Sequence, residues 1–168
     1  MKPLLLLAIV FSTFFSVSAQ ESQTDATTYY FIRHAEKDTS DKSNRNPNLT
    51  ETGKARAEKW NTVFKTVDFD LVYSTNYNRT LQTAQPTATG QELEIEIYDP
   101  RQLNPKDFVE NTKGKTVLVV GHGNTTPMFV NAILGESKYQ NMAESDNSSL
   151  FIVTVVGEYK TDQVLTID

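Results

Sequence analysis

The sequence of 168 residues contains no cysteine, and this absence removes three kinds of chemistry. Without thiols the chain can form no disulfide, no thiolate metal site and no cysteine nucleophile. The fold must therefore be stabilised by its core alone. Histidine is almost as scarce, because His34 and His122 are its only two occurrences.

Basic residues are outnumbered by acidic ones, which gives a formal net charge of −5. Nucleic-acid binding usually needs a basic face, so this balance argues against a nucleic-acid partner. An anionic substrate would have to be attracted locally, by a few placed arginines.

The first 19 residues differ from the rest of the chain. Lys2 provides a positive start, residues 4–17 are almost wholly apolar, and Val17, Ser18 and Ala19 are small or apolar, which is typical of a secretory signal peptide cleaved after Ala19. The apolar run is short against the ~20 residues that span a bilayer, so a membrane anchor is the weaker alternative. We therefore expect a secreted or periplasmic protein with no membrane span after cleavage, whose 15 basic and 21 acidic residues give a net charge of −6.

After the signal peptide, residues 20–28 are polar and without periodicity, which predicts a flexible lead-in. The remaining residues, 29–168, have the size of one domain. Expected strands alternate with expected helices, which predicts an α/β fold: a three-layer sandwich with a mostly parallel central sheet flanked by helices, closed by a C-terminal strand pair.

The expected elements follow from apolar periodicity and from residues that start or stop helices. A helix opens at Thr50, the expected N-cap, with a buried stripe that extends to Val67. Pro86 is expected to kink or end the helix that follows the second strand. Expected strands cover residues 29–32, 71–74, 93–98, 117–120, 150–156 and 164–167, the last two as a hairpin, and short helices cover 105–111 and 125–134.

Each histidine lies just past an expected buried strand. In an open α/β sheet, reactive groups gather where the strands end, so His34 and His122 could share one crevice. At such a position a histidine can present one ring nitrogen to a substrate while the other donates to a backbone carbonyl. Arg33, next to His34, offers a planar guanidinium suited to phosphate oxygens.

Arg79 and the glycines beside His122 complete the candidate site. Arg79 lies in the first turn of a helix, where free backbone N–H groups already favour anions. Gly121 and Gly123 allow a sharp turn and leave room for a ligand. Taken singly, Arg79 could be a surface arginine and His122 a core histidine.

Together these segments resemble the histidine phosphatase superfamily, also called phosphoglycerate-mutase-like. The resemblance covers residues 29–135 and is closest to the small capless branch that includes phosphohistidine phosphatases, because no large insertion is present. The motifs that carry it occur in the family's order: Arg33-His34-Ala35-Glu36, Leu49-Thr50-Glu51-Thr52-Gly53, Val72-Tyr73-Ser74 with Arg79 to Ala84, and Val119 to Gly123.

The resemblance implies that His34 is the nucleophile that accepts a phosphoryl group. Arg33, Arg79 and His122 would hold the phosphoryl oxygens together with His34, and neither a cofactor nor a metal would be needed. Phosphoryl transfer depends mainly on positioning and charge neutralisation, which agrees with these roles. The implied function is an exported, metal-independent phosphatase that hydrolyses a small phosphomonoester or phosphoramidate through a phosphohistidine.

The family's proton donor has no clear counterpart here. Where larger members have an aspartate after the second histidine, this chain has Gly123 and Asn124. Asp99 is the first candidate for the acid, with Glu36 and Asp107 behind it. A chain without a strong proton donor could still cleave substrates that have good leaving groups. The loop after the first histidine offers further phosphate donors, among which the sequence does not choose: Lys37, Ser43, Asn44 and Arg45.

Two other functions stay open at this stage. The missing acid would fit a catalytically weak or inactive module of the same fold that binds a phosphorylated ligand. A metallohydrolase using both histidines is disfavoured, because no short His-x-x-x-His pairing is present and nearby arginines would repel a cation. The substrate and the oligomeric state are not readable from the sequence.

Overall fold

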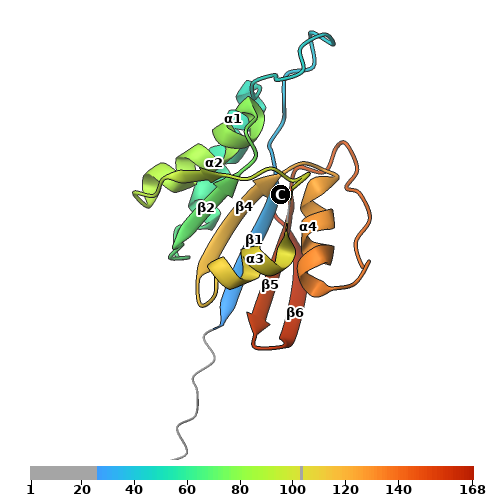
Figure 1. Ribbon diagram of the computed structural model, residues 1–168. Coiled ribbons are helices and arrows are strands. Elements are labelled where there is room, and N and C mark those ends of the chain that lie inside the picture. Colours follow the sequence, from blue (N-terminus) through green and yellow to red (C-terminus); the bar gives the residue numbers. More distant parts are fainter. Residues whose placement is uncertain (1–25, 103) are drawn as a thin grey trace, which may run out of the picture.

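The computed structural model describes residues 26–102 and 104–168, so the expected signal peptide and most of the lead-in lie outside the described residues. Six strands and four helices alternate through most of this part of the chain (Figure 1). They run in the order β1 (Thr27–Arg33), α1 (Glu51–Val63), β2 (Leu71–Ser74), α2 (Asn78–Gly90), β3 (Ile95–Ile97), α3 (Pro105–Asn111), β4 (Thr116–Gly121), α4 (Thr125–Leu134), β5 (Ser149–Val156) and β6 (Tyr159–Thr166).

The strands form one sheet in the order β3-β2-β4-β1-β5-β6. The first four of these are parallel, and β5 and β6 add two antiparallel strands at one edge. The predicted mostly parallel sheet with a C-terminal strand pair is therefore confirmed.

Alternate residues of the central strands supply two cores, one on each face of the sheet. Phe31 and Val119 lie in the core beside α3 and α4, whereas Ile32 and Val120 lie in the core beside α1 and α2. Figure 1 shows the same division, with α1 and α2 on one face and α3 and α4 on the other. The result is the predicted three-layer sandwich.

Most predicted elements are confirmed, and the differences have local causes. β1 begins at Thr27, so Thr27 and Thr28 belong to the sheet rather than to a flexible lead-in, because both register with Val155 and Thr154 of β5. The strand expected over residues 93–98 is shortened to β3, which pairs with β2 through three residues only. Val67 lies beyond the end of α1.

Pro86 is expected from the sequence to kink or end its helix, but it does not end it, because α2 continues to Gly90. A proline inside a helix removes one backbone hydrogen bond and costs about 3 kcal/mol. Here the residues around it are held by the core: Thr83, Ala84, Thr87 and Ala88 are fully buried. Packing against the sheet and α1 offsets the loss of that bond.

The start of α1 is attached to the chain just beyond His34. The N-cap Thr50 donates its backbone N–H to the Glu36 carbonyl at 2.8 Å, and its hydroxyl accepts from the Gly53 N–H at 3.0 Å. Gly53 lies so close to this segment that a Cβ atom there would be 2.2 Å from the Glu36 oxygen. The residue must be glycine for the helix to approach the backbone of the first histidine segment.

Replacing Gly53 with alanine therefore should destabilise the protein. The new methyl would meet a backbone oxygen, which cannot rotate away, so we expect Gly53→Ala to lower the free energy of unfolding by about 2 kcal/mol or more. Urea denaturation measures the change. The matched control is Gly90→Ala, whose Cβ would meet only the Asn61 side-chain amide. That control should stay within about 1 kcal/mol of the wild type, and equal losses in both variants would contradict the steric explanation.

Candidate active site

A cleft of about 880 Å³ opens where the parallel strands β1, β2 and β4 end. The four residues predicted to bind phosphate, Arg33, His34, Arg79 and His122, all line it. They come from three separate places in the chain: the end of β1 with the residue that follows it, the first turn of α2, and the residue directly after β4. Topology alone brings them together, as expected for an α/β sheet.

The two histidines face one another because β1 and β4 are neighbours in register. Arg33 pairs with Gly121, so the residues that follow, His34 and His122, occupy equivalent positions at the strand ends. Their ring centroids are 5.5 Å apart, with the planes inclined by 67°. The predicted shared crevice is confirmed.

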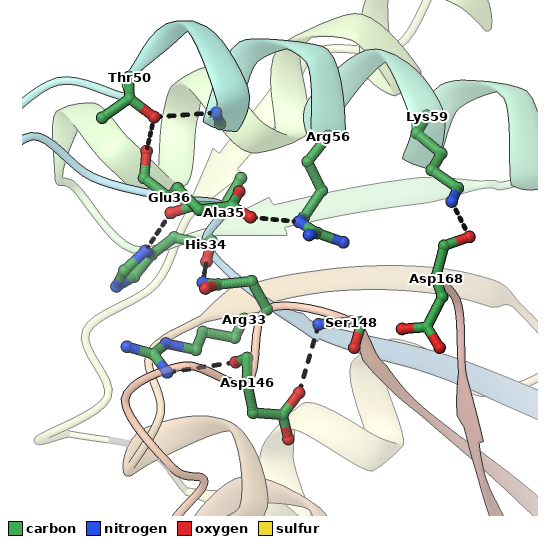
Figure 2. Close-up of polar contacts among 12 residues, drawn as sticks. Arg33, His34, Ala35, Glu36, Thr50, Arg56, Lys59, Asp146, Ser148 and Asp168 are labelled. Atoms are coloured by element: carbon green, nitrogen blue, oxygen red, sulfur yellow. Dashed lines mark hydrogen bonds and ion pairs between the residues drawn. The ribbon is translucent and has the colours of Figure 1, made fainter.

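His34 is held in one tautomer by its own neighbour. Its Nδ1 lies 2.7 Å from the Ala35 carbonyl oxygen, which can only accept, so Nδ1 carries the hydrogen (Figure 2). The pKa of His34 is lowered to about 3, mainly by burial and in part by the positive charge of Arg33. A neutral ring with hydrogen on Nδ1 leaves a lone pair on Nε2.

The backbone around His34 is fixed from two more directions. The Ala35 N–H donates to the buried Thr83 hydroxyl at 2.9 Å, and that hydroxyl donates to the Arg79 carbonyl at 2.7 Å. The Asn147 side-chain amide donates to the His34 carbonyl at 2.8 Å. These bonds tie the first histidine to the helix that carries Arg79 and to the segment that precedes β5.

His122 is oriented by Thr75, the residue that follows β2. Its Nε2 lies 2.9 Å from the Thr75 Oγ1, whose hydroxyl donates to Thr80 at 3.0 Å. Burial lowers the pKa of His122 to about 4, assisted by the positive charge of Arg79. His122 is therefore neutral near pH 7 while the cleft is free of an anion.

Arg79 has donors with no protein partner. Its Nε and Nη1 are buried without a hydrogen bond, and burial lowers the pKa of its guanidinium. One face of the guanidinium lies over the Tyr77 ring, with Cζ 4.5 Å from the centroid. Since unpaired buried donors are costly, these N–H groups are suited to an anion that enters the cleft.

Arg33 is anchored from the far end of the chain. Its Nη1 donates to the carbonyls of Ala143, Glu144 and Asp146, the first at 2.6 Å, and its Nη2 pairs with the Glu144 carboxylate at 3.1 Å. Figure 2 shows the bond to Asp146. The Nε of Arg33 stays buried without a partner. The guanidinium is fixed in place while one N–H remains available.

The glycines beside His122 serve packing within the site more than ligand access. A Cβ on Gly123 would lie 3.3 Å from the Arg33 Cζ, and one on Gly121 would lie 2.8 Å from the Thr126 hydroxyl. Both glycines let side chains of the site lie against the backbone of the turn. The expectation that they leave room for a ligand stays a prediction.

The candidate acids lie in different surroundings. Asp99 lines the cleft, but Arg101 donates to both of its carboxylate oxygens and lowers its pKa, which favours the ionised form. Glu36 does not line the cleft and pairs with Arg56 at 2.8 Å (Figure 2). Asp107 accepts from Asn104 at the start of α3, outside the cleft.

Of the loop residues considered as phosphate donors, only Lys37 lines the cleft. Ser43, Asn44 and Arg45 are exposed, and the first two bond to Asp41.

Sequence reasoning missed Thr75, Thr83, Glu144 and Asn147. Thr75 could have been found from its place at a strand end. The other three act through contacts distant in sequence, which no local pattern reveals.

Across residues 26–102 and 104–168, no group of three or more histidine, cysteine, aspartate or glutamate side chains is placed to hold a metal ion. None of the helices in this part of the chain is long and apolar enough to cross a membrane.

Solved structures of phosphoglycerate-mutase-like proteins share this fold. A phosphoglycerate mutase from Bacillus anthracis aligns with a TM-score of 0.67 at 16% identity, over 87% of this chain and 95% of its own. A protein assigned as the phosphohistidine phosphatase SixA of Agrobacterium tumefaciens aligns with 0.61 at 20%, over 83% and 98%. A phosphoserine phosphatase from Entamoeba histolytica, solved with phosphoserine, aligns with 0.59 at 18%, over 83% and 95%.

Part of the sequence also matches a family model. A model of the histidine phosphatase superfamily (branch 1) matches residues 29–100, which include Arg33, His34 and Arg79. The resemblance predicted from the motifs is thereby confirmed, and the match supports phosphatase chemistry. Among curated proteins, none matches the chain at a significant level.

The unpaired donors of Arg79 lead to a test of phosphate binding that needs no turnover. Inorganic phosphate at about 100 times its Kd should raise the free energy of unfolding by about 2.7 kcal/mol. Arg79→Met should lose this response, and without phosphate it should be at least as stable as the wild type, because two unpartnered buried donors are gone. Thermal and urea unfolding with and without phosphate measure both effects. Arg45→Met, outside the cleft, is the control, and an unchanged response in Arg79→Met would refute the assignment.

Proposed function

We propose that this protein is an exported, metal-independent phosphatase that hydrolyses a phosphomonoester or phosphoramidate through a phosphohistidine on His34. The observation that carries the proposal is a neutral imidazole with its Nε2 free, in a cleft lined by two arginines and a second histidine. The superfamily match supports the same chemistry.

In the first step the His34 Nε2 lone pair attacks phosphorus, and the bond between phosphorus and the leaving group breaks. Negative charge spreads over the three remaining phosphoryl oxygens, where the free N–H groups of Arg33 and Arg79 can donate. A bound phosphate dianion favours protonation of His122, which then contributes a further positive charge.

In the second step water attacks the phosphohistidine, the bond between phosphorus and nitrogen breaks, and inorganic phosphate leaves. The proton lost by the water ends on phosphate or solvent, and His34 returns to its neutral state. The same cationic groups stabilise both steps, so the protein needs no rearrangement between them.

The leaving group departs with little help from a carboxylic acid. The two acidic residues of the cleft, Asp99 and Glu144, are each paired with an arginine. We therefore propose that good substrates have leaving groups that are stable without immediate protonation. The same observation favours the second candidate function, a module of this fold that binds a phosphorylated ligand and turns it over poorly.

The nucleophile is tested by trapping the intermediate. We expect the mature protein to hydrolyse p-nitrophenyl phosphate in EDTA, and a rapid acid-free quench to reveal a phosphopeptide that contains His34. His34→Ala should lower kcat by about a thousandfold or more. Met128→Ala, outside the cleft, is the control for folding and handling.

The pH profile of kcat/KM distinguishes this nucleophile from an ordinary imidazole. Burial holds the pKa of His34 near 3, so the free enzyme keeps its nucleophile neutral well below the usual titration range of histidine. Lowering the pH from 7 to about 5 should not deplete the neutral form of His34.

The trapping experiment has two outcomes that would replace the proposed mechanism. One is phosphorylation of His122 instead of His34. The other is phosphate binding with no covalent intermediate, which would favour the binding module.

Export rests on the pattern of residues 1–19. When the full chain is expressed in a diderm bacterium, we expect the protein recovered outside the cytoplasm to begin at Gln20. Intact mass spectrometry of the periplasmic and cytoplasmic fractions measures this. A full-length chain confined to the cytoplasm would contradict export and leave the phosphatase proposal standing.

A further inference from the structure

Two large apolar side chains are exposed at the cleft. Tyr77 is 40% exposed and Ile97 is 53% exposed, and both line the cleft that contains the histidines. Single exposed apolar residues need no explanation, but two that line one cavity indicate a binding surface. We call this pair the apolar wall.

The wall lies beside the phosphate-binding groups. The Tyr77 ring packs edge-on against the His122 ring, with centroids 5.1 Å apart and planes at 88°. The Arg79 guanidinium lies 4.5 Å from the centroid of the same ring. Two groups that are expected to touch the phosphoryl oxygens thus fix the ring, so a substituent bonded directly to that phosphoryl group would come close to it.

Ile97 extends the wall from the neighbouring strand. β2 and β3 are parallel, and Ser74 pairs with Ile97 at their ends. Tyr77 follows β2 by three residues, so both members of the wall lie at the same edge of the sheet. Since Ile97 is more than half exposed at the end of an edge strand, its methyl groups are available to a ligand.

The pairing of the charged residues in the cleft also favours an apolar ligand. Asp99 pairs with Arg101 at 2.8 Å, and Glu144 pairs with Arg33 at 3.1 Å. Both carboxylate oxygens of Asp99 accept from Arg101, and one oxygen of the exposed Glu144 pairs with Arg33, so neither carboxylate is unpaired. A leaving group that is apolar and stabilises its own negative charge suits this cleft better than a sugar or an amino-acid hydroxyl.

Resting on the proposed function, we infer that the cleft selects aryl phosphates, in which the phosphoryl group is bonded through oxygen directly to an aromatic ring. The ring packs against Tyr77 and Ile97 while the phosphoryl group meets the histidines and arginines. The ring also delocalises the charge of the departing phenolate. The apolar wall is thus the specificity-determining part of the site.

Binding of phosphonates tests this without turnover, because their phosphorus–carbon bond is not hydrolysed. Calorimetric titration should show phenylphosphonate bound about tenfold more tightly than methylphosphonate, since a well-placed ring contact and its buried area contribute that much. Cyclohexylphosphonate, of similar size but without a π system, should fall between the two. Measuring each ratio within one protein cancels any change in the affinity for the phosphonate group itself.

Substitutions in the apolar wall should change the ratio of the affinities for phenylphosphonate and methylphosphonate. Ile97→Ala should reduce the preference for phenylphosphonate to about threefold, and Tyr77→Ala should abolish it even if it weakens both ligands through Arg79. Met128→Ala is the matched control, because Met128 is 47% exposed but does not line this cleft. It should leave the ratio unchanged.

Equal affinity for phenylphosphonate and methylphosphonate in the wild type would overturn the inference, as would a preference that survives both wall substitutions. A cyclohexyl group bound as tightly as the phenyl group would overturn the aromatic part of it. A protein that binds phenylphosphonate preferentially but never forms a phosphohistidine would refute the proposed function and leave the inference intact.

Discussion

The parallel pairing of β1 with β4 is the constraint on which the candidate site depends. Because Arg33 registers with Gly121, His34 and His122 leave the sheet side by side. A register shift of one residue would reverse which side chains face each core and would also separate the two rings along the strands. Burial of the apolar residues on both faces of these strands therefore sets the geometry of the polar groups at their ends.

The site combines groups that are individually unfavourable. Two arginines and two histidines share a partly buried cleft, and each histidine responds with a lowered pKa, which removes charge where the arginines already supply it. Donors are left free on both arginines, although carbonyls of residues 143–146 hold the Arg33 guanidinium and the Tyr77 ring packs against that of Arg79. Such a cluster of cationic groups and unpaired donors is stable only as part of a well-packed fold, and an anion that enters the cleft stabilises it most.

Local patterns were enough to predict the layers of the fold and the four central residues of the candidate site. The apolar runs predict the buried strands. The residues that follow these runs, Arg33 and His34 or Gly121 and His122, predict the candidate site. Pro86 shows where local rules fail, because the neighbouring buried residues hold α2 together across it. The contacts of residues 143–146 with Arg33 could not be predicted from the sequence either, because they join positions about 110 residues apart that share no motif.

That support has a consequence for the order in which the protein becomes competent. β1 is made early, but the carbonyls that hold the Arg33 guanidinium come from residues 143–146, and Asn147 then binds the carbonyl of His34. A nascent chain that ends before these residues can pair β1 with β4 and still lack a fixed guanidinium. Contacts of such long sequence separation also form late because loop closure precedes them. The anion cradle therefore cannot form before residues 143–147 have been synthesised and have folded back onto the end of β1.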